Sequence, residues 1–303
     1  MKETNSNLEV HFLVCHKDAK MAGHCLDSLF KYSKTPLGFI IHDDGSLTEE
    51  DYSDILQKGE NTKIIPRQES DECMEENLRQ YPNCHQYRKE HIYALKLLDI
   101  AFMSQNDFGY CDSDILFLRP FKNLFHWPDS KTSAIFMQDY SSSYSMLPWT
   151  LLGNDKPKLV SKVNAGLIFF RKQSYDLDFI EWFLKNKNFR HKVGWLEQTC
   201  WAALGRHVGC RQWNPEQVVL MRPWTEDSPQ LVAGHFVKES RYRMDNFLSI
   251  SQQNLNHSSP IEIDTFIPND CNLFELGLVH AKRQLKRTKN YKKFLGITPK
   301  VTQ

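Results

Sequence analysis

The sequence predicts an α/β fold with a mixed, mainly parallel sheet flanked by helices. Apolar runs of strand length, rich in β-branched residues, alternate from the start of the chain with longer stretches of helical period. Strands and helices that alternate in this way imply a parallel sheet with right-handed crossovers. The 303 residues are 41% hydrophobic and 25% charged, which suits one large core. No stretch has the composition of a linker, so we expect one domain over residues 1–278 and a basic tail over 279–303.

The first part of the chain shows this alternation most clearly. We expect strands at 10–15, 38–42 and 63–65, and helices at 21–32 and 48–58. The second of these helices opens with an N-cap pattern, in which Thr48 is followed three residues later by Asp51. The elements form two successive strand-helix-strand units, which places the three strands side by side in one parallel sheet.

The middle of the chain predicts a long helix and several buried strands. Ile92, Leu95, Leu98 and Phe102 recur at three- or four-residue spacing, which indicates a helix of roughly twenty residues from about residue 85, with one apolar stripe facing a sheet. Further strands are expected at 108–111, 115–118, 133–138 and 163–171, and further helices at 174–185 and 196–204.

Charge and composition exclude several classes of protein. Lys and Arg total 38 against 37 Asp and Glu, and the formal charge of +1 gives no reason to expect a nucleic-acid partner. No stretch approaches the ~20 apolar residues that span a bilayer. Residues 1–10 are polar and lack the apolar segment of a secretory signal, so we expect a cytoplasmic protein. The eight cysteines form no CxxC pair, which argues against a zinc module or a disulfide framework.

Two aspartates stand where a predicted buried strand ends. In a chain of this composition an Asp-x-Asp arises about once by chance, and the repeat at Asp176 and Asp178 suits a helix N-terminus. Asp112 and Asp114 differ, because they separate two apolar runs. Open α/β sheets bind ligands at the carboxyl ends of their strands, and two buried carboxylates are costly without a cation. We therefore favour a Mg²⁺ or Mn²⁺ site here over a structural turn.

Polar groups near the ends of neighbouring strands are further candidates. Asp43 and Asp44 follow the second strand, where a carboxylate can accept a hydrogen bond from a nucleobase or ribose; a plain Asp-Gly turn explains them equally well. His16 follows the first strand and is a candidate contact to the substrate. Lys96 lies beside the apolar stripe of its helix, so its ammonium either meets phosphate at the strand ends or extends to solvent.

Two later segments combine small or polar residues with the start of a regular element. Asn164 and Gly166 begin a buried strand, where small residues let the backbone approach a sugar closely; a strand bulge is the alternative. Glu197 and Gln198 begin a helix, where helix capping is the alternative to a role at a reaction centre.

Taken in order, these segments resemble a nucleotide-sugar glycosyltransferase of the GT-A type. The runs at 91–96 (HIYALK), 110–114 (YCDSD), 164–166 (NAG) and 197–198 (EQ) are similar to the family 8 group, which includes glycogenin and the lipopolysaccharide galactosyltransferases. The similarity spans roughly residues 9–240. It implies a single GT-A, Rossmann-like domain with hexosyltransferase activity that depends on Mn²⁺ or Mg²⁺.

The resemblance also implies roles for individual residues. It assigns Lys96 to the donor diphosphate, Asp112 and Asp114 to the metal, Ser113 to the donor, and Asn164, Gly166, Glu197 and Gln198 to the donor sugar and the reaction centre. In the family a later histidine completes the metal shell and a lysine grips phosphate. His235 and Lys238 are the nearest match, with His280 as the rival histidine.

The chain departs from the family pattern at two points. The family's His-x-x-Gly-x-x-Lys-Pro-Trp is not reproduced, because Lys238 follows His235 too early and no Pro-Trp comes after it. Thr199 replaces the acid that often follows the acid-Gln pair. The resemblance therefore favours the GT-A type more strongly than one family.

The expected function is transfer of a sugar from a nucleotide diphosphate sugar, a UDP-sugar, to a hydroxyl of a glycan, lipid or protein acceptor. The cation and Lys96 would neutralise the charge that grows on the leaving diphosphate. If the configuration is retained, Gln198 would steady the oxocarbenium-like centre; if it is inverted, Glu197 becomes the candidate general base. The sequence leaves open this choice, the donor sugar, the acceptor and the oligomeric state.

Two other functions compete with this one. A sugar nucleotidyltransferase would carry a Gly-rich phosphate loop after the first strand, and this chain has no such glycines. A non-catalytic nucleotide-sugar-binding homologue would keep the fold, but the intact Asp112, Asp114, Asn164 and Gln198 argue against lost activity.

The C-terminal segment is strongly basic. Residues 279–294 read VHAKRQLKRTKNYKKF, with seven Lys or Arg and no acid, which leaves the rest of the chain net acidic. One interpretation is a solvated terminal helix. The other is a patch between Lys282 and Lys293 that holds the protein at the inner, anionic face of a membrane.

Overall fold

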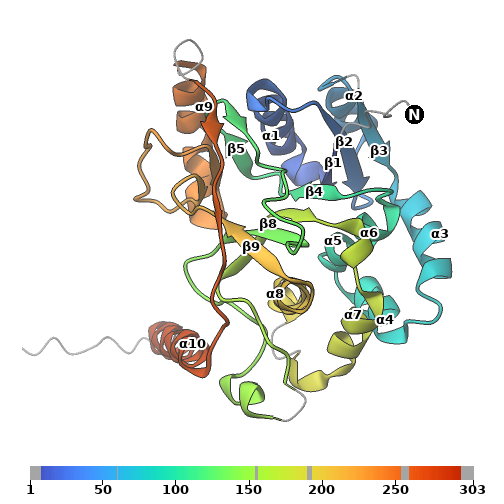
Figure 1. The fold of residues 1–303 in the computed structure, drawn as a ribbon, viewed down its shortest axis with the longest axis vertical. Coiled ribbons are helices and arrows are strands. Elements are labelled where there is room, and N and C mark those ends of the chain that lie inside the picture. Colours follow the sequence, from blue (N-terminus) through green and yellow to red (C-terminus); the bar gives the residue numbers. More distant parts are fainter. Residues whose placement is uncertain (1–7, 60, 154–155, 190–192, 254–258, 295–303) are drawn as a thin grey trace, which may run out of the picture.

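The computed structural model describes residues 8–59, 61–153, 156–189, 193–253 and 259–294 (Figure 1). Eight strands form its central sheet: β1 (Leu8–Val14), β2 (Leu37–Asp43), β3 (Thr62–Ile65), β4 (Phe108–Cys111), β7 (Ala134–Gln138), β8 (Val163–Phe170), β9 (Cys210–Trp213) and β13 (Thr265–Phe266). Their order across the sheet is β13-β9-β7-β8-β4-β1-β2-β3. Pairing is parallel from β4 to β3 and between β7 and β9, and antiparallel on both sides of β8 and at β13. This mixed, mainly parallel sheet confirms the predicted fold class.

Two small sheets extend from the central one. One has three strands in the order β10 (Val218–Leu220), β11 (Ala233–His235) and β5 (Ile115–Phe117), and the other pairs β12 (Ile261–Glu262) with β6 (Phe121–Lys122). The strands predicted on either side of Asp112 and Asp114 therefore belong to different sheets. The chain leaves the central sheet at the end of β4 and enters the three-stranded sheet at β5.

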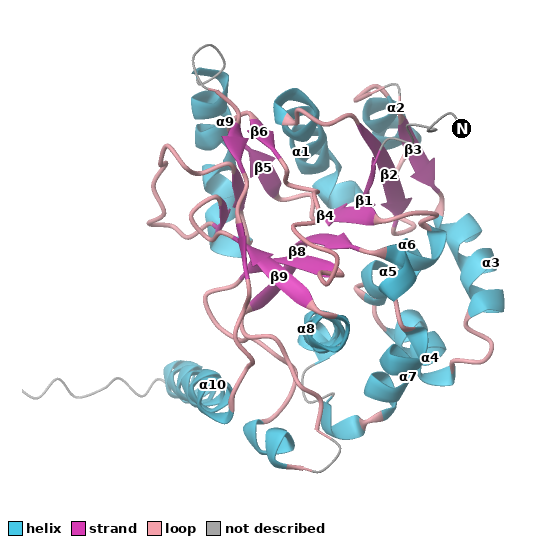
Figure 2. Cartoon of the chain, viewed as in Figure 1, coloured by secondary structure: helices cyan, strands magenta, loops and turns pink. Residues whose placement is uncertain are grey.

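Helices cover both faces of the central sheet, as Figure 2 shows for α1 and α2 on one side and α5, α6 and α8 on the other. The α-helices are α1 (Ala19–Tyr32), α2 (Glu49–Leu56), α3 (Arg67–Asn77), α4 (Pro82–Glu90), α5 (Ala94–Leu97), α6 (Asp99–Met103), α7 (Leu177–Lys185), α8 (Leu196–Val208), α9 (Met244–Gln253) and α10 (Leu273–Phe294). Short 3-10 helices are η1 (His16–Asp18), η2 (Pro148–Leu152), η3 (Lys172–Ser174), η4 (Lys187–Phe189), η5 (Val193–Trp195) and η6 (Lys238–Arg243). Among the helices in the described part of the chain, none has the length and apolar character needed to cross a bilayer.

The sheet is buried from both sides, which explains the continuous apolar strands. All eight residues of β8 are buried. Ile168 and Phe170 lie in the core beneath α8, whereas Leu167 and Phe169 lie in the core on the α1 side. A strand covered on both faces needs apolar side chains in both directions, so its sequence does not alternate.

The N-terminal strand-helix-strand units have the predicted order. The capping box at the start of α2 is confirmed, because the Thr48 hydroxyl accepts from the Asp51 amide at 3.2 Å and the Asp51 carboxylate accepts from the Thr48 amide at 2.8 Å. The predicted boundary between domain and tail, at 278/279, lies inside α10.

The single long helix predicted from residue 85 is wrong, because the chain forms the three short helices α4, α5 and α6 there. His91 is extended, with φ −145° and ψ 122°, and ends α4. Ile92 is 40% exposed and does not join the buried stripe of Leu95 and Leu98. A buried ion pair between Arg88 of α4 and Asp99 of α6, at 2.6 Å, holds the pieces together. Tertiary contacts therefore override the helical period in this segment.

Candidate functional site

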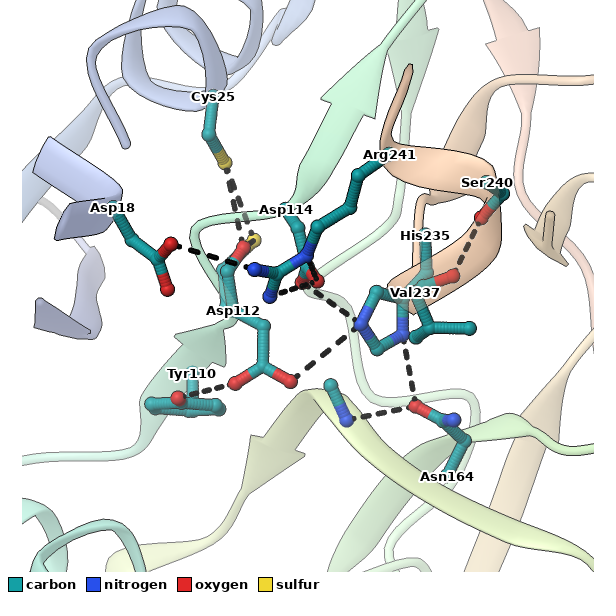
Figure 3. Close-up of polar contacts among 12 residues, drawn as sticks. Asp18, Cys25, Tyr110, Asp112, Asp114, Asn164, His235, Val237, Ser240 and Arg241 are labelled. Carbon is teal, nitrogen blue, oxygen red and sulfur yellow. Dashed lines mark hydrogen bonds and ion pairs between the residues drawn. The ribbon is translucent and has the colours of Figure 1, made fainter. Parts of the chain in front are cut away.

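Strand pairing brings three predicted metal ligands together at one edge of the sheet. β5 pairs with β11 in a register that places Ile115 opposite His235, and the Phe236 amide donates to the Asp114 carbonyl at 2.8 Å. His235 Nε2 consequently lies 2.9 Å from Asp114 Oδ1 and 3.6 Å from Asp112 Oδ2 (Figure 3).

The three side chains fit a divalent cation. One ligand atom from each of Asp112, Asp114 and His235 lies within 4.8 Å of the others. Two carboxylates and an imidazole form a donor set that suits Mn²⁺, and Mg²⁺ accepts the carboxylates with water and phosphate oxygens.

Asn164 orients the histidine for this task. Asn164 Oδ1 accepts from the Gly166 amide at 2.9 Å and lies 3.2 Å from His235 Nδ1. An oxygen in that position makes Nδ1 the donor, so Nε2 is the nitrogen that faces the aspartates. His280, the rival candidate, lies on α10, with its ring 6.0 Å from that of Trp149.

Asp114 is held ionised by its neighbours. Burial raises the pKa of its carboxyl, but His235 and Arg241 outweigh burial and hold the pKa at about 2. Burial lowers the pKa of His235, but Asp114 and then Asp112 outweigh this and raise it. The buried carboxylate is thus compensated by two cationic side chains.

Lys96 points toward the predicted diphosphate position. Its side chain is only 7% exposed, which rules out extension to solvent, and its Nζ lies 3.1 Å from Asp112 Oδ1 and 3.8 Å from Glu197 Oε1. The ammonium also sits 4.4 Å from the centre of the Tyr110 ring, and the Tyr110 hydroxyl donates to Asp112 Oδ1 at 2.5 Å. Burial lowers the pKa of Lys96, whereas Asp112 and Glu197 raise it by more, so the side chain stays charged.

Glu197 and Gln198 lie in the first turn of α8, and the Glu197 carboxylate reaches Lys96 at 3.8 Å. Burial raises the pKa of Glu197 to about 7, against the lowering effect of Lys96. Gln198 Nε2 donates to the Ser143 carbonyl at 3.4 Å. Thr199, which stands where the family often has an acid, accepts from the Ser145 amide at 2.8 Å and donates to the Trp195 carbonyl at 2.6 Å. Thr199 therefore holds the loop at 143–145 against α8.

The predicted residues at the ends of β1 and β2 mainly organise a turn. Asp43 Oδ1 accepts from the amides of Gly45, Ser46 and Leu47 at 2.7, 3.1 and 3.2 Å, and Asp43 Oδ2 accepts from the Tyr52 hydroxyl at 3.1 Å. Asp44 Oδ1 accepts from the Ser46 hydroxyl at 2.6 Å. These bonds fit the Asp-Gly turn that the sequence left open.

His16 and Lys238 lie apart from the acid pair. His16 Nδ1 lies 2.6 Å from the capping carboxylate of Asp51, which raises the pKa of the imidazole. Lys238 is exposed at the start of η6, with a φ of 45°. Ser113, between the two aspartates, is buried.

Arg241 is the residue that the sequence interpretation missed. Its Nη2 and Nε lie 2.7 and 3.0 Å from Asp114 Oδ2, and its Nη1 lies 3.4 Å from Asp18 Oδ1 (Figure 3). A signal was present, because Arg241 stands six residues after His235, the same separation as His and Lys in the family's His-x-x-Gly-x-x-Lys. An Arg in place of Lys hid the match.

Comparisons with known proteins find similarity at the level of structure. No family model matches the chain, and no curated protein matches its sequence. The bifunctional glycosyltransferase WbbM superposes with a TM-score of 0.56 and 12% identity, over 83% of this chain and 50% of WbbM. Mouse xyloside xylosyltransferase 1 gives 0.50 and 11%, over 85% of this chain and 96% of its own.

The glycosyltransferase GlyE of Streptococcus pneumoniae gives a TM-score of 0.50 and 12% identity, over 83% of this chain and 62% of GlyE. The chain thus spans half the length of WbbM and less than two thirds of GlyE. These similarities confirm the predicted fold, a single GT-A domain of the kind found in glycosyltransferases.

Proposed function

We propose that the chain is a divalent-metal-dependent glycosyltransferase that moves a sugar from a nucleotide diphosphate sugar, a UDP-sugar, to an acceptor hydroxyl. One observation carries the proposal: Asp112, Asp114 and His235 converge at the strand ends, with the buried ammonium of Lys96 beside them. A cation site next to a fixed positive charge suits a diphosphate leaving group.

The chain's own residues divide the work as follows. Asp112, Asp114 and His235 would hold the cation, which supplies Lewis-acid stabilisation of the leaving diphosphate when bound. Lys96 would bind a diphosphate oxygen from the buried side of the site. Asn164 orients His235 through Nδ1.

The sugar would lie on the side of the cluster where α8 begins. Glu197 lies beside Lys96 on that side, and Gln198 follows it in the first turn of α8. A Glu197 carboxyl with a pKa of about 7 suits a general base for inversion, and the Gln198 amide suits stabilisation of the charged centre for retention. His16, Asp43 and Asp44 are proposed to approach the nucleoside, and Lys238 the phosphates.

The core test is release of UDP in the presence of Mn²⁺ from a panel of UDP-sugars, with donors first ranked by thermal shift. Asp114→Ala is expected to abolish release. Asp27→Ala, which removes an acid paired with Lys58 on the outer face of α1, is the matched control and is expected to retain it. Equal turnover by both variants and the unaltered protein would overturn the proposal.

The same protein samples separate the competing functions. A sugar nucleotidyltransferase would release pyrophosphate from a nucleoside triphosphate and a sugar 1-phosphate. A non-catalytic homologue would bind UDP with Mn²⁺ and release nothing from any donor. We expect neither result, because the chain has no Gly-rich phosphate loop after β1 and keeps Asp112, Asp114, Asn164 and Gln198 intact.

We also propose that α10 contacts an anionic membrane surface, where a lipid-linked acceptor would be found. Phe274, Leu278 and Leu285 are exposed and lie on one side of the helix, opposite the packed side that carries Leu276. Lys282 and Lys286 are exposed and lie beside this stripe, both on the same side of it. Apolar and basic side chains on one exposed surface are typical of helices that lie in the bilayer interface.

Contacts of the packed side tie α10 to the site. The Glu275 carboxylate accepts from the Ser161 hydroxyl at 2.9 Å, and the Arg283 guanidinium lies 3.5 Å from the centre of the Trp195 ring, directly before α8. A second copy of the chain is a poorer occupant, because it would bring two basic surfaces together.

Sedimentation with vesicles of phosphatidylcholine, with and without phosphatidylglycerol, tests the contact. Binding is expected only with the anionic lipid, and the pair Lys282→Gln and Lys286→Gln is expected to weaken it. The pair Lys63→Gln and Lys185→Gln removes the same charge elsewhere and is expected to bind normally. Equal loss in both pairs, or binding to phosphatidylcholine alone, would contradict the proposed surface.

A further inference from the structure

Arg241 occupies the solvent-facing side of the candidate metal site. Its side chain is 41% exposed, whereas the carboxylate that it contacts, Asp114, is 6% exposed. Two nitrogens of the guanidinium reach the same oxygen, Asp114 Oδ2, and the third reaches Asp18 Oδ1 at 3.4 Å. Figure 3 shows the guanidinium between the two acids, with His235 on the other side of Asp114.

We propose that Arg241 is a positioning residue that competes with the divalent cation for Asp114 and passes to the donor diphosphate when the cation binds. The inference rests on the proposed function, because it presumes the cation site. Arg241 pairs with a ligand oxygen of the cation site, so metal and nucleotide are expected to bind cooperatively.

The competition follows from the number of available oxygens. Asp114 Oδ1 is paired with His235 at 2.9 Å and Oδ2 with Arg241. Arg241 donates twice to Oδ2, which fills the lone pairs of that oxygen, and a cation at Oδ1 would face the guanidinium charge across the same carboxylate. His235 is itself a ligand in the set and is held by Asn164 through Nδ1, so its Nε2 already faces the cation position.

Arg241 is the partner that is free to leave. It is carried by the short 3-10 helix η6 and is the more exposed member of the pair. While it is in place, it compensates a carboxylate that would otherwise be buried without a countercharge. A bound cation takes over that role, and two positive charges on one carboxylate oxygen repel each other.

The displaced guanidinium has a suitable destination. A diphosphate bound to the same cation would place oxygens beside the vacated position, and the planar guanidinium matches phosphate oxygens in pairs. Metal alone therefore leaves the Arg241 guanidinium without its carboxylate partner, whereas metal with UDP exchanges that pair for a new one with phosphate oxygens. Binding of the two ligands is coupled through Arg241.

Mn²⁺ binding, followed by electron paramagnetic resonance of the free ion with and without UDP, tests this without any turnover. The unaltered protein is expected to bind Mn²⁺ weakly alone and more tightly with UDP. Arg241→Gln is expected to bind Mn²⁺ alone at least about fivefold more tightly and to lose most of the gain from UDP. Arg241→Lys, which keeps the charge but not the paired contact, is expected to lie between them.

Arg243→Gln is the matched control. Arg243 lies two residues away, donates to the Arg222 carbonyl at 2.7 Å and packs on Phe247 at 5.3 Å, so its loss removes the same charge without touching Asp114. Its Mn²⁺ affinity is expected to equal that of the unaltered protein.

The outcomes separate the two proposals. Protein that binds neither Mn²⁺ nor UDP with Mn²⁺ overturns the proposed function and this inference together. Protein that binds both, with a coupling that Arg241→Gln retains, overturns the inference alone. An equal gain in Arg243→Gln would also overturn it, because the effect would then be one of net charge. A circular-dichroism melt of each variant confirms that it is folded.

Discussion

The imidazole of His235 lies directly against the Cα of Gly166, so that a Cβ at position 166 would fall 2.5 Å from His235 Nδ1 and 2.9 Å from Asn164 Oδ1. The glycine amide also donates to Asn164, and its carbonyl accepts from the Asp112 amide at 2.7 Å. Gly166 thus connects strand β8, the acid pair and His235. Any side chain there has to displace His235 from the acid pair.

Gly166→Ala is therefore expected to weaken Mn²⁺ binding and to lower the free energy of unfolding by about 1–3 kcal/mol, the usual cost of overpacking a core. Urea denaturation and a Mn²⁺ titration measure the two effects. Gly277→Ala is the control, because a Cβ there meets nothing within 4 Å and alanine favours the α10 helix. Normal Mn²⁺ affinity in Gly166→Ala would show that His235 is not part of the set.

Glu197 predicts a pH dependence of stability. Its pKa is raised by burial from 4.5 to about 7 in the folded protein, so between these values the folded state binds more protons than the unfolded state. The stabilising effect of the neutral carboxyl is complete below about pH 4.5 and is lost as the pH rises through about 7.

Glu197→Gln removes this dependence. Relative to the unaltered protein, the variant is expected to gain about 2–3 kcal/mol in the free energy of unfolding between pH 5 and pH 8. Urea denaturation at both pH values measures the difference, in which the contributions of other titrating groups cancel. A difference that stays constant across this window would mean that Glu197 titrates normally.

Replacement of Lys96 is expected to lower the rate of catalysis. Lys96→Met leaves Glu197 and Asp112 without the ammonium between them and removes the proposed donor to the leaving diphosphate. We expect kcat for UDP release to fall by about 10²–10³-fold, the range for loss of one preorganised electrostatic donor.

Lys89→Met is the control for Lys96, since that ammonium is 60% exposed and lies 3.5 Å from Glu75. Its kcat is expected to be unchanged. A Lys96→Met enzyme with full kcat and only a raised KM would place the lysine in donor binding and not in leaving-group stabilisation.

The Arg88–Asp99 ion pair is expected to contribute to the stability of the segment from α4 to α6. Arg88→Met leaves Asp99, which is 1% exposed, without the partner at 2.6 Å that joins α4 to α6. The expected loss in the free energy of unfolding is about 3–5 kcal/mol, as for other buried pairs broken on one side. Replacing Asp99 by Leu in the same variant is expected to restore most of it.

Arg79→Met, at an exposed position after α3, serves as the reference for this loss and is expected to change stability by less than about 0.5 kcal/mol. If Arg88→Met changes the free energy of unfolding as little as Arg79→Met does, the apolar contacts of Leu95 and Leu98 alone would hold α4 and α6 together.

Most of the strands and helices, and the acid pair at the end of β4, can be predicted from the amino-acid sequence alone. Apolar runs, the Thr48 capping box and the interruption at Asp112 and Asp114 are local properties, and local patterns are sufficient to predict them. The resemblance implied roles for Lys96 and Glu197, but the sequence left open whether Lys96 reaches the strand ends or solvent, and the structure places its ammonium 3.1 Å from Asp112.

The residues that complete the site come from distant parts of the chain and depend on strand pairing. His235 and Arg241 reach Asp114 because β11 pairs with β5 across more than a hundred residues, and no local pattern specifies such a pairing. The break at His91 and the turn at Asp43 also depend on contacts between residues apart in the sequence. Asp99 pairs with Arg88, and the Tyr52 hydroxyl donates to Asp43. Neither the helical period nor a position at a strand end predicts these contacts. Residues distant in the sequence thus determine how the buried charge of Asp114 is compensated. His235 and Arg241 do so here, and with His235 the acid pair forms a candidate cation site.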